Sequence, residues 1–180
     1  IKLWNAVRFA LLNLNEYRQV RIAPERLQLE DQWILSRLSG TIHQVTRYLQ
    51  AYQPSAAIGC AREFFWSEFC DWYLELIKPR IKNPATKNLV QTLLAFTIDR
   101  ILRLFHPFVP YITEALWERL NDQAPSREQI LGKTSDDLLI NTAWPLDEKE
   151  RCDPGSEDTF GLLQSIVRSM RDLKSQYQVS

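Results

Sequence analysis

A chain of 180 residues can bury a hydrophobic core without disulfides or metals, and this length fits one large domain. Apolar residues make up 45% and charged residues 24%, which excludes a disordered protein, and only five glycines argue against β-sandwiches and barrels. Basic and acidic residues balance at 22 each, which excludes a surface coated in positive charge but leaves room for a local basic patch.

The cysteines and the ends of the chain further restrict the kind of protein that this sequence can encode. Cys60, Cys70 and Cys152 form no C-x-x-C pair, so we expect neither a disulfide framework nor a metal site, and a reducing cytoplasm fits them. No apolar run reaches membrane length. The chain begins inside a helical pattern and ends without a closing cap, so we expect a fragment of a longer chain.

Residues 2–14 predict a first helix with two distinct faces. The core face holds Leu3, Trp4, Val7, Leu11 and Leu14. The opposite face holds Lys2, Asn5, Arg8, Phe9 and Leu12. This mixture fits either a solvated helix face or a nucleic-acid surface. In the second case Lys and Arg bind phosphates, Asn meets a base edge and Phe stacks on a base.

An aromatic helix is predicted after a polar connection over 15–27 and a long helix over 29–52. It begins at Pro54, ends at Pro79, and holds six aromatic residues between positions 64 and 73. Its wide apolar arc predicts contact with several neighbouring helices. We expect its aromatic residues to form core rather than a ligand cage, above all these four: Trp66, Phe69, Trp72 and Tyr73.

A helix over 84–105 is apolar on nearly every side, which predicts that other helices surround it. Its Arg100 and Arg103 either reach a phosphate or form a structural ion pair with Asp99 or with a neighbouring helix, and the ion pair is the favoured interpretation. Two prolines in 106–110 predict a rigid bend, followed by a short helix over 111–120.

Residues 121–155 form the least regular stretch, within which 138–140 predict a short extended segment. A closing helix follows over 156–177. Its predicted core face is Phe160, Leu163, Val167, Met170 and Leu173. A basic stripe on the same helix is either a solvated face or a secondary nucleic-acid surface: Arg168, Arg171 and Lys174.

The elements together predict an all-α fold, a helical bundle of about five or six helices. We expect one domain over 1–180, with a core over 1–120, an irregular part over 121–155 and the closing helix over 156–177. No catalytic motif accompanies them. Gly132, Lys133 and Thr134 lack the upstream glycine of a phosphate-binding loop, and neither H-E-x-x-H nor G-x-S-x-G occurs.

Four runs of sequence resemble valyl-tRNA synthetases, and they occur in the order of that family. They are Lys-Leu-Trp-Asn-Ala-Val-Arg-Phe at 2–9, Asp-Gln-Trp-Ile-Leu-Ser-Arg-Leu at 31–38, Phe-Trp-Ser-Glu-Phe-Cys-Asp-Trp-Tyr-Leu-Glu-Leu-Ile-Lys-Pro-Arg at 65–80 and His-Pro-Phe-Val-Pro-Tyr-Ile-Thr-Glu-Ala-Leu-Trp at 106–117. The later part matches more loosely, through Trp144-Pro145 and the Arg168-x-x-Arg171 helix. The Cys-Asp-Trp-Tyr-Leu-Glu run separates this family from most isoleucyl and leucyl relatives.

The resemblance implies the helical anticodon-binding domain that follows the catalytic domain of a class I synthetase. The family's H-I-G-H and K-M-S-K-S signatures are missing, so ATP with Mg would be handled upstream, in the parent enzyme. This segment would contact the catalytic domain of the same chain and bind the anticodon stem-loop of tRNA(Val) in the cytoplasm, without cofactor or membrane.

The same resemblance places the tRNA-binding face on Lys2, Asn5, Arg8 and Phe9. Valine anticodons share an adenine and a cytosine, so Asn5 and Arg8 are expected to read base edges, with Phe9 as a stacking platform. Two alternatives remain open. One is the anticodon-binding domain of an isoleucyl or other branched-chain synthetase, and the other is a non-enzymatic helical scaffold for protein interactions.

Overall fold

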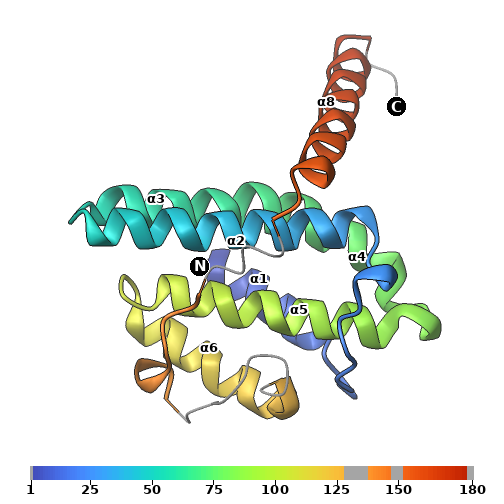
Figure 1. The fold of residues 1–180 in the computed structure, drawn as a ribbon. Helices are drawn as coiled ribbons and strands as arrows, with labels where there is room; N and C mark the ends of the chain where they lie inside the picture. The colour runs from blue at the N-terminus through green and yellow to red at the C-terminus, as the bar shows by residue number, and fades with distance from the viewer. Residues whose placement is uncertain (1, 128–137, 147–151, 178–180) are drawn as a thin grey trace.

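A computed structural model of the protein describes residues 2–127, 138–146 and 152–177 (Figure 1). Its longer elements are α1 (Lys2–Leu12), α2 (Leu29–Gln50), α3 (Pro54–Glu63), the π-helical η2 (Phe64–Tyr73), α4 (Leu74–Ile81), α5 (Pro84–Phe105), α6 (Pro110–Gln123) and α8 (Pro154–Gln176). Three short 3₁₀ turns are η1 (Pro24–Arg26), η3 (Pro125–Arg127) and η4 (Leu139–Asn141). No strand occurs in these ranges. Because α3, η2 and α4 follow one another without a break, the described residues form six long helical units, and the predicted all-α class is confirmed.

Side chains near two helix starts accept backbone hydrogen bonds. The Asp31 carboxylate accepts from the backbone N–H of Gln28 at 3.0 Å, which fixes the start of α2. The Asn83 side chain accepts from the N–H of Ala85 at 3.0 Å, and Pro84 occupies the first position of α5. The closing helix begins at Pro154 rather than at Ser156, because the carboxylate of Asp153 accepts from the N–H of Ser156 and caps it.

The predicted end of the aromatic helix at Pro79 is wrong, since Pro79 lies inside α4. Proline removes one helical hydrogen bond, which leaves the carbonyl of Glu75 without its helical donor. Both residues are exposed, so water can satisfy that carbonyl, and the helix ends only two residues later, at Ile81.

The continuous helix formed by α3, η2 and α4, residues 54–81, is called the aromatic rod below. It has one buried side chain at every fourth residue. The row is Ala57, Ala61, Phe65, Phe69, Tyr73 and Ile77. An α-helix completes a turn in about 3.6 residues, so a four-residue step overshoots the turn, whereas the wider π-helix undershoots it. Alternation of the two keeps the whole row against the core. Phe69 and Tyr73 are fully buried as predicted, while Trp66 and Trp72 lie at the edge of the core.

Helix α5 is buried at every residue from 89 to 105, which confirms that other helices surround it. Its polar side chains therefore bond to the elements around it. Gln91 Nε2 donates to the carbonyls of Asn13 and Asn15 at 2.8 and 3.0 Å. Thr92 Oγ1 accepts from the N–H of Val20 at 3.1 Å. These bonds fix the end of α1 and the connection that follows it.

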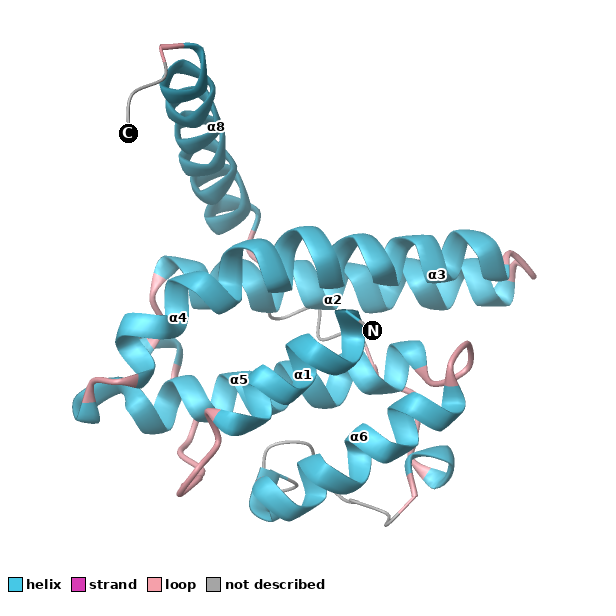
Figure 2. Ribbon diagram, turned by 180° about the vertical axis from the view of Figure 1, so that it is seen from behind, coloured by secondary structure: helices cyan, strands magenta, loops and turns pink. Residues whose placement is uncertain are grey.

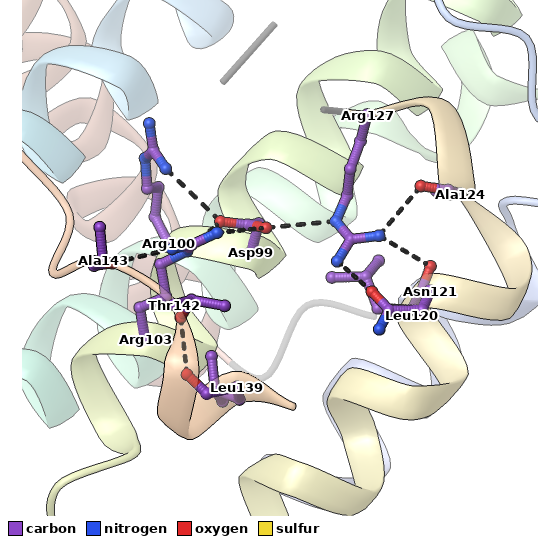
Figure 3. Close-up of polar contacts among 10 residues, drawn as sticks. All are labelled: Asp99, Arg100, Arg103, Leu120, Asn121, Ala124, Arg127, Leu139, Thr142 and Ala143. Carbon is purple, nitrogen blue, oxygen red and sulfur yellow. Dashed lines mark hydrogen bonds and ion pairs between the residues drawn. The ribbon is translucent and has the colours of Figure 1, made fainter. Parts of the chain in front are cut away.

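A buried carboxylate, Asp99, joins three parts of the chain (Figure 3). It accepts from Arg103 Nε at 2.7 Å and from Arg127 Nε at 3.2 Å. Arg103 also donates to the carbonyl of Ala143 at 2.8 Å, and both guanidinium groups lie over the ring of Trp117. Arg100 Nη1 lies 3.5 Å from the same carboxylate. The predicted structural ion pair of Arg100 and Arg103 is therefore confirmed.

A second buried carboxylate, Asp31, ties the start of α2 to α4. Its two oxygens accept from the two terminal nitrogens of Arg80 at 2.9 and 2.7 Å. Tyr73 donates to the same carboxylate at 3.3 Å. Burial alone would lower the pKa of Arg80, but the hydrogen bonds and charge of Asp31 raise it, so Arg80 stays charged. The aromatic rod is therefore fixed in orientation against α2.

Helix α8 projects away from the bundle and contacts it near its base (Figures 1 and 2). The Phe160 ring stacks on Trp33, with centroids 3.9 Å apart, and meets the edge of Trp72 at 5.9 Å. The predicted core face is wrong beyond this point. Leu163, Met170 and Leu173 are exposed, because no described element covers the outer part of α8.

The irregular part is described only in pieces. The predicted extended segment at 138–140 is wrong, since Leu139 begins the 3₁₀ turn η4 and its side chain is buried. The predictions for Gly132, Lys133 and Thr134 lie outside the described residues. Over the described ranges no helix is both long and apolar enough to cross a lipid bilayer.

Replacement of Asp99 by Asn should destabilise the protein by about 3–5 kcal/mol, because it leaves buried guanidinium groups without their carboxylate. Urea unfolding followed by circular dichroism measures the change. The control is Asp71→Asn, whose side chain is 61% exposed and which should change the free energy of unfolding by no more than about 0.5 kcal/mol. Equal stability of the two variants would contradict the structural role of Asp99.

Replacement of Phe160 by Ala should release α8 from the bundle while the bundle stays folded, because this ring makes the aromatic contacts of the helix base. Amide hydrogen exchange should accelerate in 154–176 and stay unchanged in α5. Leu162→Ala, at a side chain that is 63% exposed, is the matched control. Unchanged exchange in α8 of the Phe160 variant would show that other contacts hold the helix.

Candidate functional site

The outward face of α1 gathers the four residues that the sequence singled out. Leu3, Val7, Ala10 and Leu11 are buried against the bundle. The helical period then leaves Lys2, Asn5, Arg8 and Phe9 exposed on the opposite side, together with Leu12. The face therefore presents two cations, an amide and an aromatic ring to solvent.

The aromatic rod forms one border of this face. Lys2 Nζ lies 3.8 Å from the Asp71 carboxylate and 5.4 Å from the centroid of the Trp66 ring. Lys78 Nζ, held by Glu75 at 2.6 Å, lies 5.7 Å from the centroid of the Phe9 ring. The Phe9 side of the face thus has a cation beside a ring that remains 41% exposed.

Helix α6 forms the other border, and α1 and α6 pack together on this side of the molecule (Figure 2). Between them lies a cleft of about 120 Å³, lined by Arg8, Leu11, Leu12, Asn15, Arg119 and Gln123. The Arg119 guanidinium lies 4.8 Å from the centroid of the Trp4 ring. Sequence reasoning missed Arg119 and Gln123. Their polar position on α6 was visible in the pattern, but the packing of α6 beside α1 was not.

The basic stripe of α8 has different surroundings. Arg168 lines a cleft of about 280 Å³ together with three glutamates: Glu63, Glu68 and Glu157. Arg171 lies over the ring of Trp72, 5.6 Å from its centroid, and Lys174 is exposed farther along the helix. The α2–α3 pair separates α8 from α1 in both ribbon views (Figures 1 and 2). The structure therefore does not bring the two predicted cationic surfaces together.

Ion pairs at the base of α8 occupy three of the charged side chains that line this cleft. Arg37 donates to Glu68 at 2.9 and 2.8 Å and to Glu157 at 3.1 Å. Hydrogen bonds from Arg37 to Glu68, and secondarily to Glu157, raise the pKa of Arg37 against the opposing effect of burial. The positive charge of Arg37 is therefore neutralised by Glu68 and Glu157.

The thiol nearest the α1 face is inert near neutral pH. Burial raises the pKa of Cys70 to about 12, with Lys2 lowering it and Asp71 raising it further. Because the thiol stays protonated near neutral pH, it is a weak nucleophile. Among the residues that the structure describes, no group of three or more His, Cys, Asp and Glu could hold a metal ion.

The chemistry of the α1 face is that of binding rather than catalysis. Cations can contact phosphates, an amide can meet a base edge, and an exposed ring can stack on a base. These three group types suit a single strand whose bases are splayed out from a helix. The buried side of α1 packs against the core, which sets the direction in which this face points.

Comparison with known proteins gives a consistent family. The family described as "Anticodon-binding domain of tRNA ligase" matches residues 31–180. A valine–tRNA ligase of Fervidobacterium nodosum is 38% identical over 178 residues, which is 99% of this chain and 19% of that protein. Those of Thermotoga maritima and Synechocystis are 39% and 38% identical, over 97% of this chain and 18% and 19% of their own lengths.

The coverage of these matches is uneven in two respects. The chain spans about a fifth of the length of the curated relatives that it matches. The family match begins at residue 31 and so excludes α1. The alignment with the Fervidobacterium protein covers 99% of the chain and therefore includes nearly all of α1.

Proposed function

Because this chain belongs to the family of anticodon-binding domains of tRNA ligases, we propose that the exposed face of α1 binds the anticodon loop of a tRNA. The observation that carries the proposal is the gathering of Lys2, Asn5, Arg8 and Phe9 on one exposed side of a buried helix. Proteins read RNA sequence mainly in single-stranded loops, where aromatic rings stack on bases and polar groups reach their edges.

The names of the relatives support valine as the amino acid of that tRNA. The Fervidobacterium, Thermotoga and Synechocystis proteins are all valine–tRNA ligases, and each aligns over nearly the whole of this chain. We propose that the longer protein is a cytoplasmic valine–tRNA ligase that uses ATP with Mg outside these residues. The chain itself would then select tRNA(Val) and hold it for that reaction.

The test measures binding of the 180-residue chain to an RNA hairpin with the valine anticodon. Arg8→Ala and Phe9→Ala should each weaken binding by roughly 1–3 kcal/mol, because each removes a contact to the loop. Fluorescence anisotropy at fixed salt gives the dissociation constants. The matched control is Arg47→Ala, an exposed cation on α2 outside the α1 face, which should leave binding unchanged.

Two hairpins that differ only in the loop separate the competing functions. A hairpin with an isoleucine anticodon should bind more weakly than the valine hairpin. Tighter binding of the isoleucine hairpin would favour the alternative that the chain is the anticodon-binding domain of an isoleucyl or other branched-chain synthetase. Absence of binding to any hairpin would overturn the proposed function and favour the interaction scaffold.

A second surface supports contact with protein, and it lies on α8. Its exposed apolar stripe consists of Leu163, Ile166, Met170 and Leu173, at helical steps. Soluble proteins rarely expose such continuous apolar faces without a partner. Since the relatives are about five times longer than this chain, we propose that the catalytic domain of the same longer chain covers the stripe.

Until it is covered, the stripe should cause self-association of the 180-residue chain. The double variant Ile166→Ser with Met170→Ser should remain monomeric at concentrations where the wild-type chain forms dimers. Its unfolding midpoint should stay unchanged, because both side chains are exposed. Sedimentation velocity measures the difference, and a wild-type chain that stays monomeric at all concentrations would contradict the assignment.

A further inference from the structure

The cleft between α1 and α6 differs from the larger cleft at the base of α8 in the charge of its walls. Arg8 from α1 and Arg119 from α6 both line the smaller cleft, and no carboxylate among the described residues lines it. The larger cleft has two arginines but also three glutamates. An anion therefore meets net attraction only in the smaller of these two clefts.

The size and lining of the smaller cleft restrict what it can hold. Its volume of about 120 Å³ is well below that of typical small-molecule pockets, which begin near ~300 Å³. Leu11 and Leu12 supply an apolar wall, and the exposed amides of Asn15 and Gln123 supply hydrogen bonds. Such a cleft fits a backbone group of a polymer rather than a free cofactor.

Arg119 is positioned before any ligand arrives. Its guanidinium lies over the ring of Trp4, which holds it at the border of the α1 face while the side chain stays exposed. Neither Arg8 nor Arg119 has an ion-pair partner among the residues that the structure describes. A planar guanidinium with this freedom can offer two parallel donors to phosphate oxygens.

We propose that Arg8 and Arg119 together bind one backbone phosphate of the anticodon loop in this cleft, assisted by the amides of Asn15 and Gln123. The inference rests on the proposed function of the α1 face. It changes the role of Arg8, which the sequence assigned to a base edge. Reading of the anticodon then falls to Asn5 and Phe9, and the cleft sets the path of the strand across them.

The experiment compares Arg8→Gln, Arg119→Gln and Asn5→Ala in binding to valine and isoleucine hairpins across a salt series. Both arginine variants should weaken the two hairpins by the same factor, roughly five- to tenfold. Each should also flatten the dependence of log K on log salt, by at most about 0.7, which is the contribution of one phosphate. Asn5→Ala should instead weaken binding at an unchanged salt slope, because it removes a base-edge contact and no charge. Arg119→Lys keeps the charge and should keep the wild-type slope.

Distinct outcomes separate failure of this inference from failure of the proposed function. If Arg119→Gln changes neither affinity nor slope while Phe9→Ala still weakens binding, the cleft is not a phosphate site but the α1 face stands. If Arg8→Gln alters the ratio between hairpins at an unchanged slope, Arg8 reads a base and the inference is wrong. If the wild-type chain binds neither hairpin, both fail. Circular dichroism of each variant confirms that it is folded.

Discussion

The rest of the structure depends on the complete burial of α5 between Leu89 and Phe105. A helical segment with no solvent-facing side must find partners for its polar side chains within the protein. Gln91 Nε2 and Thr92 Oγ1 bond to backbone groups that lie beyond the end of α1, and Asp99 bonds to arginines from two elements. The hydrogen bonds of these α5 side chains therefore fix the positions of the segments that surround α5.

This constraint reaches the candidate site directly. Gln91 holds two carbonyls immediately after α1, so the orientation of α1 is set by the centre of the bundle. The Asp31–Arg80 pair then fixes the aromatic rod beside one edge of α1, and packing of α6 fixes the other edge. The α1 face thus lies between two borders whose positions come from the core, and it needs no rearrangement to present its groups.

Local chemistry was predictable from sequence wherever one element decided the outcome. A capping residue followed by proline, as at Asn83-Pro84, is a local signal of a helix start, and the period of residues 2–14 separated the buried face of α1 from the exposed one. Contacts between elements were not predictable. The position of Arg119 beside Arg8 depends on how α6 packs, and the exposure of Leu163 and Met170 depends on α8 leaving the bundle. The π-helix was missed because a row of apolar residues four apart also fits a broad α-helical arc.

In the aromatic rod, the number of residues matters as much as the residue types, because it sets which side chains face the core. Deletion of one residue between Phe64 and Tyr73 would rotate everything after the gap by roughly a quarter turn. Arg80 would then point away from Asp31, and the buried row would divide between core and solvent. Substitutions of one apolar side chain for another keep this phase and can accumulate among descendants of a gene. A single insertion or deletion here changes the phase of the helix. We therefore expect the length of this segment to vary less than its amino-acid sequence.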